Sequence, residues 1–243
     1  MSFDIGRILH EMGAFALVIV GTLAIMALAA VSVFVERLIA FAVHARKTRA
    51  LTRDVGPLLS QNNYAGLLER CEQNKGLPFA EVLRGGARAF MATHADTHVP
   101  AYEMVRREVA RRVEAATADV RRGMSVLASV GSVAPFVGLL GTVVGIIDAF
   151  EGIAAEGSGG IGAVSAGIAE ALVVTAFGLL IAIPSVLMFN ALSTKVDGIV
   201  LALGQAASEF ADHVEARAPR AAPRVELPSL AKEHRHNGAA LVV

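Results

Sequence analysis

Three long runs without charge constrain the fold of this chain more than any other feature. Residues 12–35 carry no charged side chain between Glu11 and Glu36, and residues 123–147 carry none between Arg122 and Asp148. Residues 157–194 are interrupted only by Glu170. A bilayer core about 30 Å thick needs roughly 20 apolar residues per helix. The sequence therefore predicts an all-α membrane protein with three transmembrane helices.

The composition agrees with this interpretation, because 54% of the 243 residues are hydrophobic and only 18% are charged. Soluble domains have roughly 25% charged residues. A cleaved signal peptide is the alternative for the first run, in which Ala27-Leu28-Ala29 resembles a cleavage site. That run is too long for the apolar part of a signal peptide, and the basic residues Arg37, Arg46, Lys47 and Arg49 follow it. We therefore expect the first run to be a retained span.

The placement of positive charge predicts the orientation of the spans. Most Lys and Arg residues lie between residues 43 and 122, whereas the short loop after the second span has none. Loops on the cytoplasmic side carry the excess of positive charge. We therefore expect a periplasmic amino terminus, a cytoplasmic carboxyl terminus and a location in the bacterial inner membrane.

The predicted organisation has eight segments. We expect a periplasmic interfacial helix at residues 1–11, transmembrane helices at 12–36, 123–150 and 163–192, a cytoplasmic helical domain at 37–122, a periplasmic loop at 151–162, a cytoplasmic helix extension at 193–215 and a disordered tail at 216–243.

Loop signals divide the cytoplasmic domain into short helices, at residues 54–57, 62–63, 75–78 and 85–86. After Pro100 the pattern changes to an apolar stripe with helical period, made by Val105, Val109, Val113, Ala116 and Val120. We expect this helix to run without a break into the second span. The third span should extend in the same way along Val196, Ile199, Val200, Leu203, Ala207 and Phe210. Two such extensions predict a cytoplasmic helical bundle.

Other polar groups have simpler interpretations. The arginines at positions 106, 107, 111, 112, 121 and 122 lie on a helix that leads to the membrane, so we interpret them as topology determinants and contacts for anionic lipid, not as a nucleic-acid patch. His94 and His98 are interpreted as solvated residues, and Cys71 as a structural one. The sequence contains no phosphate-binding glycine loop, catalytic triad or metal cluster. We therefore expect no enzyme activity, no metal and no cofactor.

Glycine recurs with a period of seven along the second span, at Gly131, Gly138, Gly145 and Gly152. Glycine inside a helix is about 1 kcal/mol worse than alanine, so the row should serve the close approach of another helix. The third span has a matching small-residue face, which consists of Gly167, Ala171, Thr175, Gly178, Ala182 and Ser185. We expect both spans to pack through these faces, and Pro135 and Pro184 to kink them.

Three polar residues in the spans are candidates for function: Thr142, Thr175 and Glu170. Each threonine stands in a small-residue face, where it either lines a shared narrow space or bonds its own helix backbone. A carboxylate near the middle of a membrane helix costs about 2.5 to 3.5 kcal/mol, so Glu170 should face a polar cavity or a partner. Glu170 lies about 140° around the helix from Thr175, so the two do not share a face.

The stretches APFVGLLGTVVGIIDAF (134–150) and GIAEALVVTAFGLLIAIPSVLMFN (167–190) resemble the proton-channel region of the ExbB, TolQ and MotA family. The resemblance implies a pentamer of this subunit around two transmembrane helices of a single-span partner similar to ExbD or TolR. In that family the partner's membrane aspartate carries the proton. The resemblance also implies that Thr142 and Thr175 face the central pore and that Glu170 is functionally important. Proton flow through such a stator would drive work at the cell envelope.

The sequence leaves several alternatives open. Val144 stands where ExbB and TolQ usually have tryptophan, so the subfamily is open. The driven system is TonB-type iron uptake, Tol-Pal outer-membrane maintenance or gliding motility, with a TonB-like, TolA-like or gliding effector. Two further hypotheses are a self-contained proton channel that uses Glu170 and a non-conducting membrane scaffold. Protons are the expected transported ion, although the sequence is equally compatible with sodium, and no nucleic-acid partner is expected.

Overall fold

The computed structural model describes residues 13–92, 100–156 and 161–217, and all regular secondary structure within these ranges is helical. The expected all-α fold is therefore confirmed for this part of the chain. The interfacial helix expected at 1–11, the residues His94 and His98, and nearly all of the tail expected at 216–243 lie outside the described residues.

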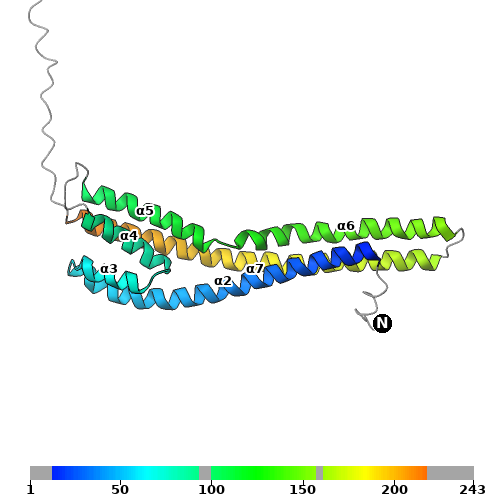
Figure 1. The fold of residues 1–243 in the computed structure, drawn as a ribbon, viewed down its shortest axis with the longest axis horizontal. Helices are drawn as coiled ribbons and strands as arrows, with labels where there is room; N and C mark the ends of the chain where they lie inside the picture. Colours follow the sequence, from blue (N-terminus) through cyan, green and yellow to red (C-terminus); the bar gives the residue numbers. More distant parts are fainter. Residues whose placement is uncertain (1–12, 93–99, 157–160, 218–243) are drawn as a thin grey trace, which may run out of the picture.

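The described chain forms six helices: α2 (Ala14–Ser60), α3 (Tyr64–Gln73), α4 (Pro78–Ala92), α5 (Ala101–Val120), α6 (Met124–Glu156) and α7 (Ile161–Glu215). The molecule is elongated, with α5 and α6 following one another along one side of α7 (Figure 1). Helices α3 and α4 lie at one end only. We call this end the distal bundle, which comprises α3, α4, α5 and residues 37–60 and 195–215 of α2 and α7. The remaining parts of α2, α6 and α7 form the membrane half.

Three of these helices are long and apolar enough to cross a membrane: α2, α6 over Met124–Gly152 and α7 over Val164–Glu215. The described chain thus has three candidate spans, the number that the sequence predicts. Large apolar side chains of the membrane half point outward, for example Ile25, Phe136 and Leu180, which are 71%, 70% and 65% exposed. An apolar surface of this kind suits contact with lipid or with other membrane helices.

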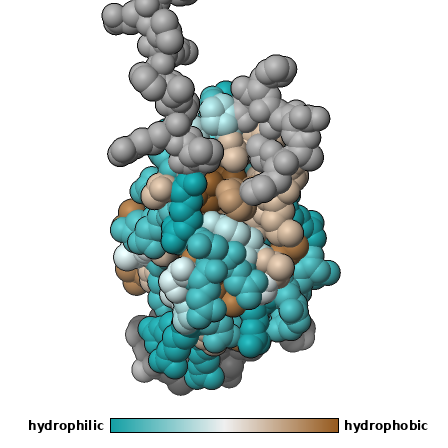
Figure 2. Space-filling view, turned by 90° about the vertical axis from the view of Figure 1, so that its left-hand side faces the viewer, coloured by the Kyte–Doolittle hydropathy of each residue, from teal (hydrophilic) through white to brown (hydrophobic). Residues whose placement is uncertain are grey.

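The distal bundle surrounds its own apolar core. Val105 and Val109 of α5 are buried there against α4, and Leu203 and Phe210 of α7 enter the same core. The two apolar stripes expected on α5 and on the end of α7 therefore face the interior, as predicted. Seen from this end, the surface is largely hydrophilic, with some hydrophobic side chains between the helices (Figure 2). The distal bundle thus has the surface of a water-exposed unit, unlike the membrane half.

Two of the expected loops are helical instead. Helix α2 continues through residues 54–57 to Ser60, because Leu51 and Val55 are buried in the distal core and packing outweighs the local breaker signal at Pro57. Helix α4 continues through Gly85 and Gly86, where a Cβ on Gly86 would lie 2.7 Å from the Phe210 ring. These glycines permit close helix packing and do not end a helix. The other two loop signals are correct, as Asn62 and Gly76 adopt positive φ angles of 56° and 84° between helices.

The expectation of one unbroken helix from Pro100 into the second span is wrong. Helix α5 ends at Val120 and α6 begins at Met124, with a turn between them. Gly123 adopts φ +79°, a left-handed conformation that favours glycine and ends a helix. The backbone N–H of Met124 bonds to the carbonyl of Arg121, which closes the turn. The membrane helix α6 and the distal helix α5 are therefore separate elements.

Proline does not interrupt the membrane helices. Pro135 lies inside α6 and Pro184 lies inside α7, and both helices are continuous across them. Each proline lacks the backbone N–H that would bond the preceding turn. The kinks expected at these two positions stay a prediction.

Cys71 provides a test of the distal core. It is 1% exposed, and burial raises the pKa of its thiol to about 11 from an ordinary value of 9.0. At pH 8 the thiolate fraction should therefore be roughly one hundredth of that of an exposed cysteine. We expect maleimide to label the folded protein very slowly in mild detergent at pH 8, and rapidly after denaturation. Equal labelling rates before and after denaturation would show that this core is open. Because the folded pKa is the higher one, the stability that thiol burial contributes is present below pH 9 and is lost as the pH rises toward 11.

Candidate functional site

The glycine row of α6 lies against α7, and the two backbones touch at Gly138 and Gly178. A Cβ on Gly138 would lie 3.1 Å from the Thr175 Cα atom and 3.2 Å from the Gly178 Cα atom. A Cβ on Gly178 would lie only 2.7 Å from the backbone oxygen of Ala134. Backbone atoms cannot turn aside as a flexible side chain can, so only glycine permits this approach.

The same contact continues along both helices, and we call it the α6–α7 seam. A Cβ on Gly131 would lie 2.7 Å from a methyl carbon of Val186, and one on Gly145 would lie 2.8 Å from the Ala171 Cβ atom. Gly167 of α7 meets the Ala149 Cβ atom in the same way, at 2.8 Å. Gly152 differs from the other members of its row, because nothing lies within 4 Å of its Cβ position. The seam therefore ends before Gly152.

Thr175 bonds across the seam. Its hydroxyl donates a hydrogen bond of 2.7 Å to the backbone carbonyl of Gly138. The alternative in which a membrane threonine bonds only its own helix does not describe Thr175 in this structure. This hydrogen bond joins the two helices at the point where glycine lets their backbones touch. It therefore fixes the position of one helix along the other.

Thr142 lies about one helical turn after Gly138 in α6, and it is only 9% exposed. Its hydroxyl donates a 2.7 Å hydrogen bond to the carbonyl of Leu139 in the same helix. Thr142 therefore makes the local backbone bond that was one of the two readings of this residue. That hydroxyl retains its capacity to accept a hydrogen bond. A role for either threonine in a pore stays a prediction.

Glu170 lies away from the threonines and bonds to the beginning of α2. Its Oε1 atom accepts a hydrogen bond of 3.2 Å from the backbone N–H of Gly13, which is the residue before the first turn of α2. Helix amino termini have free N–H groups and a partial positive charge, so a carboxylate is stabilised there. Glu170 thus ties α7 to α2 within one subunit.

Two of these contacts involve residues that the sequence did not single out. Gly13 contributes only a backbone N–H, which leaves no side-chain signal. Gly141 stands outside the period of seven, but its Cβ position lies 2.5 Å from a methyl carbon of Val174 and 3.6 Å from the Ile19 side chain of α2. Its position three residues after Gly138 is the signal that could have revealed it, because residues three apart lie on neighbouring parts of a helix surface.

The arrangement therefore places the hydroxyl groups of Thr142 and Thr175 at a narrow seam, in stretches of α6 and α7 without a charged residue. The sequence has no charged residue between Arg122 and Asp148 or between Glu170 and Lys195, and Glu170 is bonded to α2. Among the described residues no group of three His, Cys, Asp or Glu side chains is placed to hold a metal ion. Hydroxyls can donate and accept hydrogen bonds but do not carry a proton as a titrating group near neutral pH.

Comparison with known proteins decides the family. Residues 77–205, more than half of this chain, match the MotA/TolQ/ExbB proton channel family. The chain belongs to this family. The matched region includes α4, α5 and α6 and the part of α7 that forms the seam. The residues that match the MotA/TolQ/ExbB family therefore include the α6–α7 seam and much of the distal bundle.

Several relatives are named biopolymer transport protein ExbB. The one from Pseudomonas putida is 38% identical over 159 residues, which cover 63% of this chain and 48% of that protein. The one from Xanthomonas campestris pv. campestris (strain B100) is 48% identical over 100 residues, covering 41% and 39%. The one from Neisseria gonorrhoeae is 54% identical over 76 residues, covering 30% and 34%. The chain thus spans less than half the length of these relatives.

The seam can be tested with two glycines. In Gly178→Ala the new methyl group would meet backbone at 2.7 Å, and overpacking of this kind costs about 1 to 3 kcal/mol. We expect a lower thermal unfolding midpoint in detergent. Gly152→Ala is the matched control, since its Cβ position is open and alanine favours a helix by about 1 kcal/mol. Equal unfolding temperatures for the two variants would contradict the close contact of Gly178 with α6.

Proposed function

We propose that this chain is the ring-forming stator subunit of a motor in the bacterial inner membrane that is driven by the proton-motive force. Five copies would surround two transmembrane helices of a single-span partner similar to ExbD or TolR. The amino terminus would be periplasmic and the distal bundle cytoplasmic. The many Lys and Arg residues of the distal bundle, compared with none in residues 151–162, support this orientation.

One observation carries the proposal: the seam offers hydroxyl groups and no free carboxylate. Thr175 is engaged with the Gly138 carbonyl, and Glu170 is engaged with the Gly13 N–H. Proton transport through a membrane requires a group that titrates, and in membrane proteins this is an ionisable residue facing a cavity or a partner. A partner carboxylate would therefore supply the proton site. Its protonated form would donate a hydrogen bond to the hydroxyl oxygen of Thr142 or Thr175, whose own O–H groups are donated to backbone carbonyls.

Biopolymer transport is the driven process that the relatives favour. The three relatives described above are all named biopolymer transport protein ExbB. We therefore place a TonB-like effector ahead of a TolA-like or gliding effector.

Reconstitution tests the need for a partner. The purified chain in liposomes should conduct few protons by itself, because the Glu170 carboxylate of α7 is bonded to α2. Co-reconstitution with a single-span protein that carries a membrane Asp should produce flux measurable with a pH-sensitive dye. The matched control is the same partner with Asp→Asn. Substantial flux from the chain alone would contradict the proposal.

Thr175 tests the role of the hydroxyl. Thr175→Val keeps the shape of the side chain but removes the hydroxyl, whereas Thr175→Ser keeps it. Thr175→Val loses the bond to the Gly138 carbonyl and an acceptor for the partner's protonated carboxyl, each worth about 0.5 to 1.5 kcal/mol, so we expect partner-dependent flux to fall about tenfold. Thr175→Ser should remain close to the parent protein. Size measurements of the complex separate lost flux from lost assembly, and full flux in an assembled Thr175→Val complex would show that the hydroxyl is not part of the proton pathway.

Glu170 distinguishes the stator from a self-contained channel. In Glu170→Gln the amide oxygen can still accept the bond from the Gly13 N–H, but the residue no longer titrates. The stator proposal expects flux with the partner to persist in Glu170→Gln and to fall in Glu170→Ala, which loses the bond. Loss of flux in Glu170→Gln, with the complex intact, would indicate that Glu170 itself carries the proton.

A further inference from the structure

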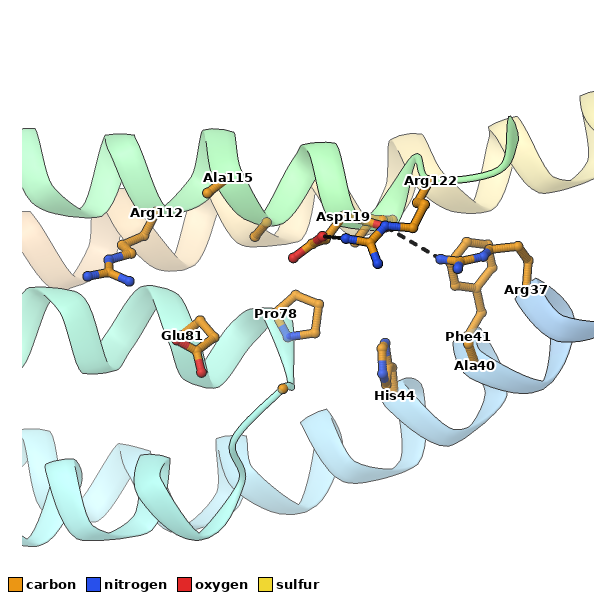
Figure 3. A pocket seen from close by; sticks show the side chains of 13 residues that line it. Arg37, Ala40, Phe41, His44, Pro78, Glu81, Arg112, Ala115, Asp119 and Arg122 are labelled. Carbon is orange, nitrogen blue, oxygen red and sulfur yellow. Dashed lines mark hydrogen bonds and ion pairs between the residues drawn. The ribbon is translucent and has the colours of Figure 1, made fainter. Parts of the chain in front are cut away.

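A cavity of about 490 Å³ lies where the distal bundle meets the membrane half. It is enclosed by α2, the beginning of α4 and the last turns of α5 (Figure 3). Arg37 and Phe41 line it from α2, and Asp119 and Arg122 line it from the end of α5 and the turn that follows. This cavity is separate from the α6–α7 seam, and nothing in the proposed proton pathway uses it.

One end of the cavity lies at the level of the membrane surface. Arg37 is the second residue after the uncharged run of α2, and Arg122 is the last charged residue before the uncharged run of α6. One arginine of α2 and one of the turn between α5 and α6 therefore line the same cavity near the height where the hydrocarbon of a bilayer ends. Phospholipid phosphate groups lie at this same height.

Arg37 is held in place but not fully satisfied. Its Nη2 atom bonds to Glu36 at 2.8 Å, and its Nη1 atom bonds to the backbone carbonyl of Asp119 at 3.4 Å. Its side chain is only 14% exposed, and its Nε atom is buried with no hydrogen-bond partner in the described chain. A buried donor on a charged group costs free energy unless an acceptor reaches it. An anion that entered the cavity would provide that acceptor.

The charges that line the cavity are engaged in ion pairs, so no unpaired carboxylate repels an incoming anion. Three arginines line the cavity, and two of them pair with acids outside the lining, Arg37 with Glu36 and Arg112 with Glu108. The two lining carboxylates are those of Glu81 and Asp119. Arg84 pairs with Glu81, and Arg122 pairs with Asp119 at 2.7 Å. Both carboxylates are thus neutralised by ion pairs. The Arg122 side chain lines the cavity and is 73% exposed, so an incoming ligand can reach it.

We propose that this cavity binds the phosphate group of an anionic phospholipid from the adjacent leaflet, with Arg37 and Arg122 as its ligands. Guanidinium groups present paired donors that match phosphate oxygens. A lipid suits the site better than soluble phosphate, because Phe41 and Ala40 give the cavity an apolar wall. The adjoining surface of α2 is also apolar, and Val35 and Ile39 are 46% and 59% exposed there for contact with acyl chains.

Native mass spectrometry of the full chain in neutral detergent tests the proposal. The probe is short-chain phosphatidylglycerol, titrated against the parent protein and the variants Arg37→Gln and Arg122→Gln. We expect one lipid to bind per chain at the lowest concentrations, with at least tenfold weaker binding in each variant, because each loses a charge-assisted hydrogen bond. Arg46→Gln is the matched control, since Arg46 is an exposed arginine of the same helix outside the cavity. This control should bind like the parent.

Each other outcome overturns the proposal. Unchanged binding in Arg37→Gln and Arg122→Gln would place the lipid elsewhere, and equal weakening in Arg46→Gln would indicate a general charge effect. Inorganic phosphate that displaces the lipid at similar concentration would identify the ligand as a soluble phosphate. Arg122→Gln carries the test if Arg37→Gln fails to fold, because Arg122 is largely exposed and its replacement disturbs little packing.

Discussion

The backbone contact between α6 and α7 at Gly138 and Gly178 is the constraint on which the membrane half depends. Lipid supplies no hydrophobic force between helices, so association in a bilayer requires close packing and interhelical hydrogen bonds. The seam provides both, since the Gly138 carbonyl that glycine brings within reach also accepts the bond from Thr175. The contact thereby determines where the hydroxyl lies, and it leaves the large apolar side chains on the outer surfaces.

The rest of the chain is organised around this pair. Helix α2 contacts α6 through Ile19, which lies next to Gly141. It also contacts α7, because the Glu170 carboxylate accepts a bond from the N–H of Gly13, just before the first turn of α2. The distal bundle then attaches through two continuous helices, α2 and α7, and through the Gly123 turn between α5 and α6. Arg37 of α2 bonds to the backbone carbonyl of Asp119 near the end of α5, and so ties α2 to α5 beside that turn.

Sequence reasoning was most successful where one physical pattern dominates. The uncharged runs predicted the spans, because a helix in lipid must be apolar over its whole length. The glycine period predicted the face of α6 that meets α7, because only small residues let two helix backbones approach closely. Sequence reasoning was wrong where tertiary packing outweighs a local signal, as at Pro57 and Gly86, and where a single glycine ends a helix, as at Gly123. The partner of Glu170 could not be predicted, since a backbone N–H from a residue far away in the sequence carries no signal of its own.

Disulfide trapping tests the seam most directly. In a Cys71→Ala background, Gly145→Cys is combined with Ala171→Cys, whose Cβ positions lie 2.8 Å apart, so a shift of about 1 Å gives disulfide geometry. Leu140→Cys with Leu172→Cys is the control pair, because both side chains point outward and are 51% and 60% exposed. After mild oxidation in membranes, we expect the first pair to form a disulfide within one chain, which is recovered as a linked peptide. The control pair should form no disulfide within one chain. Absence of the first pair's disulfide, or its formation only between chains, would contradict the account.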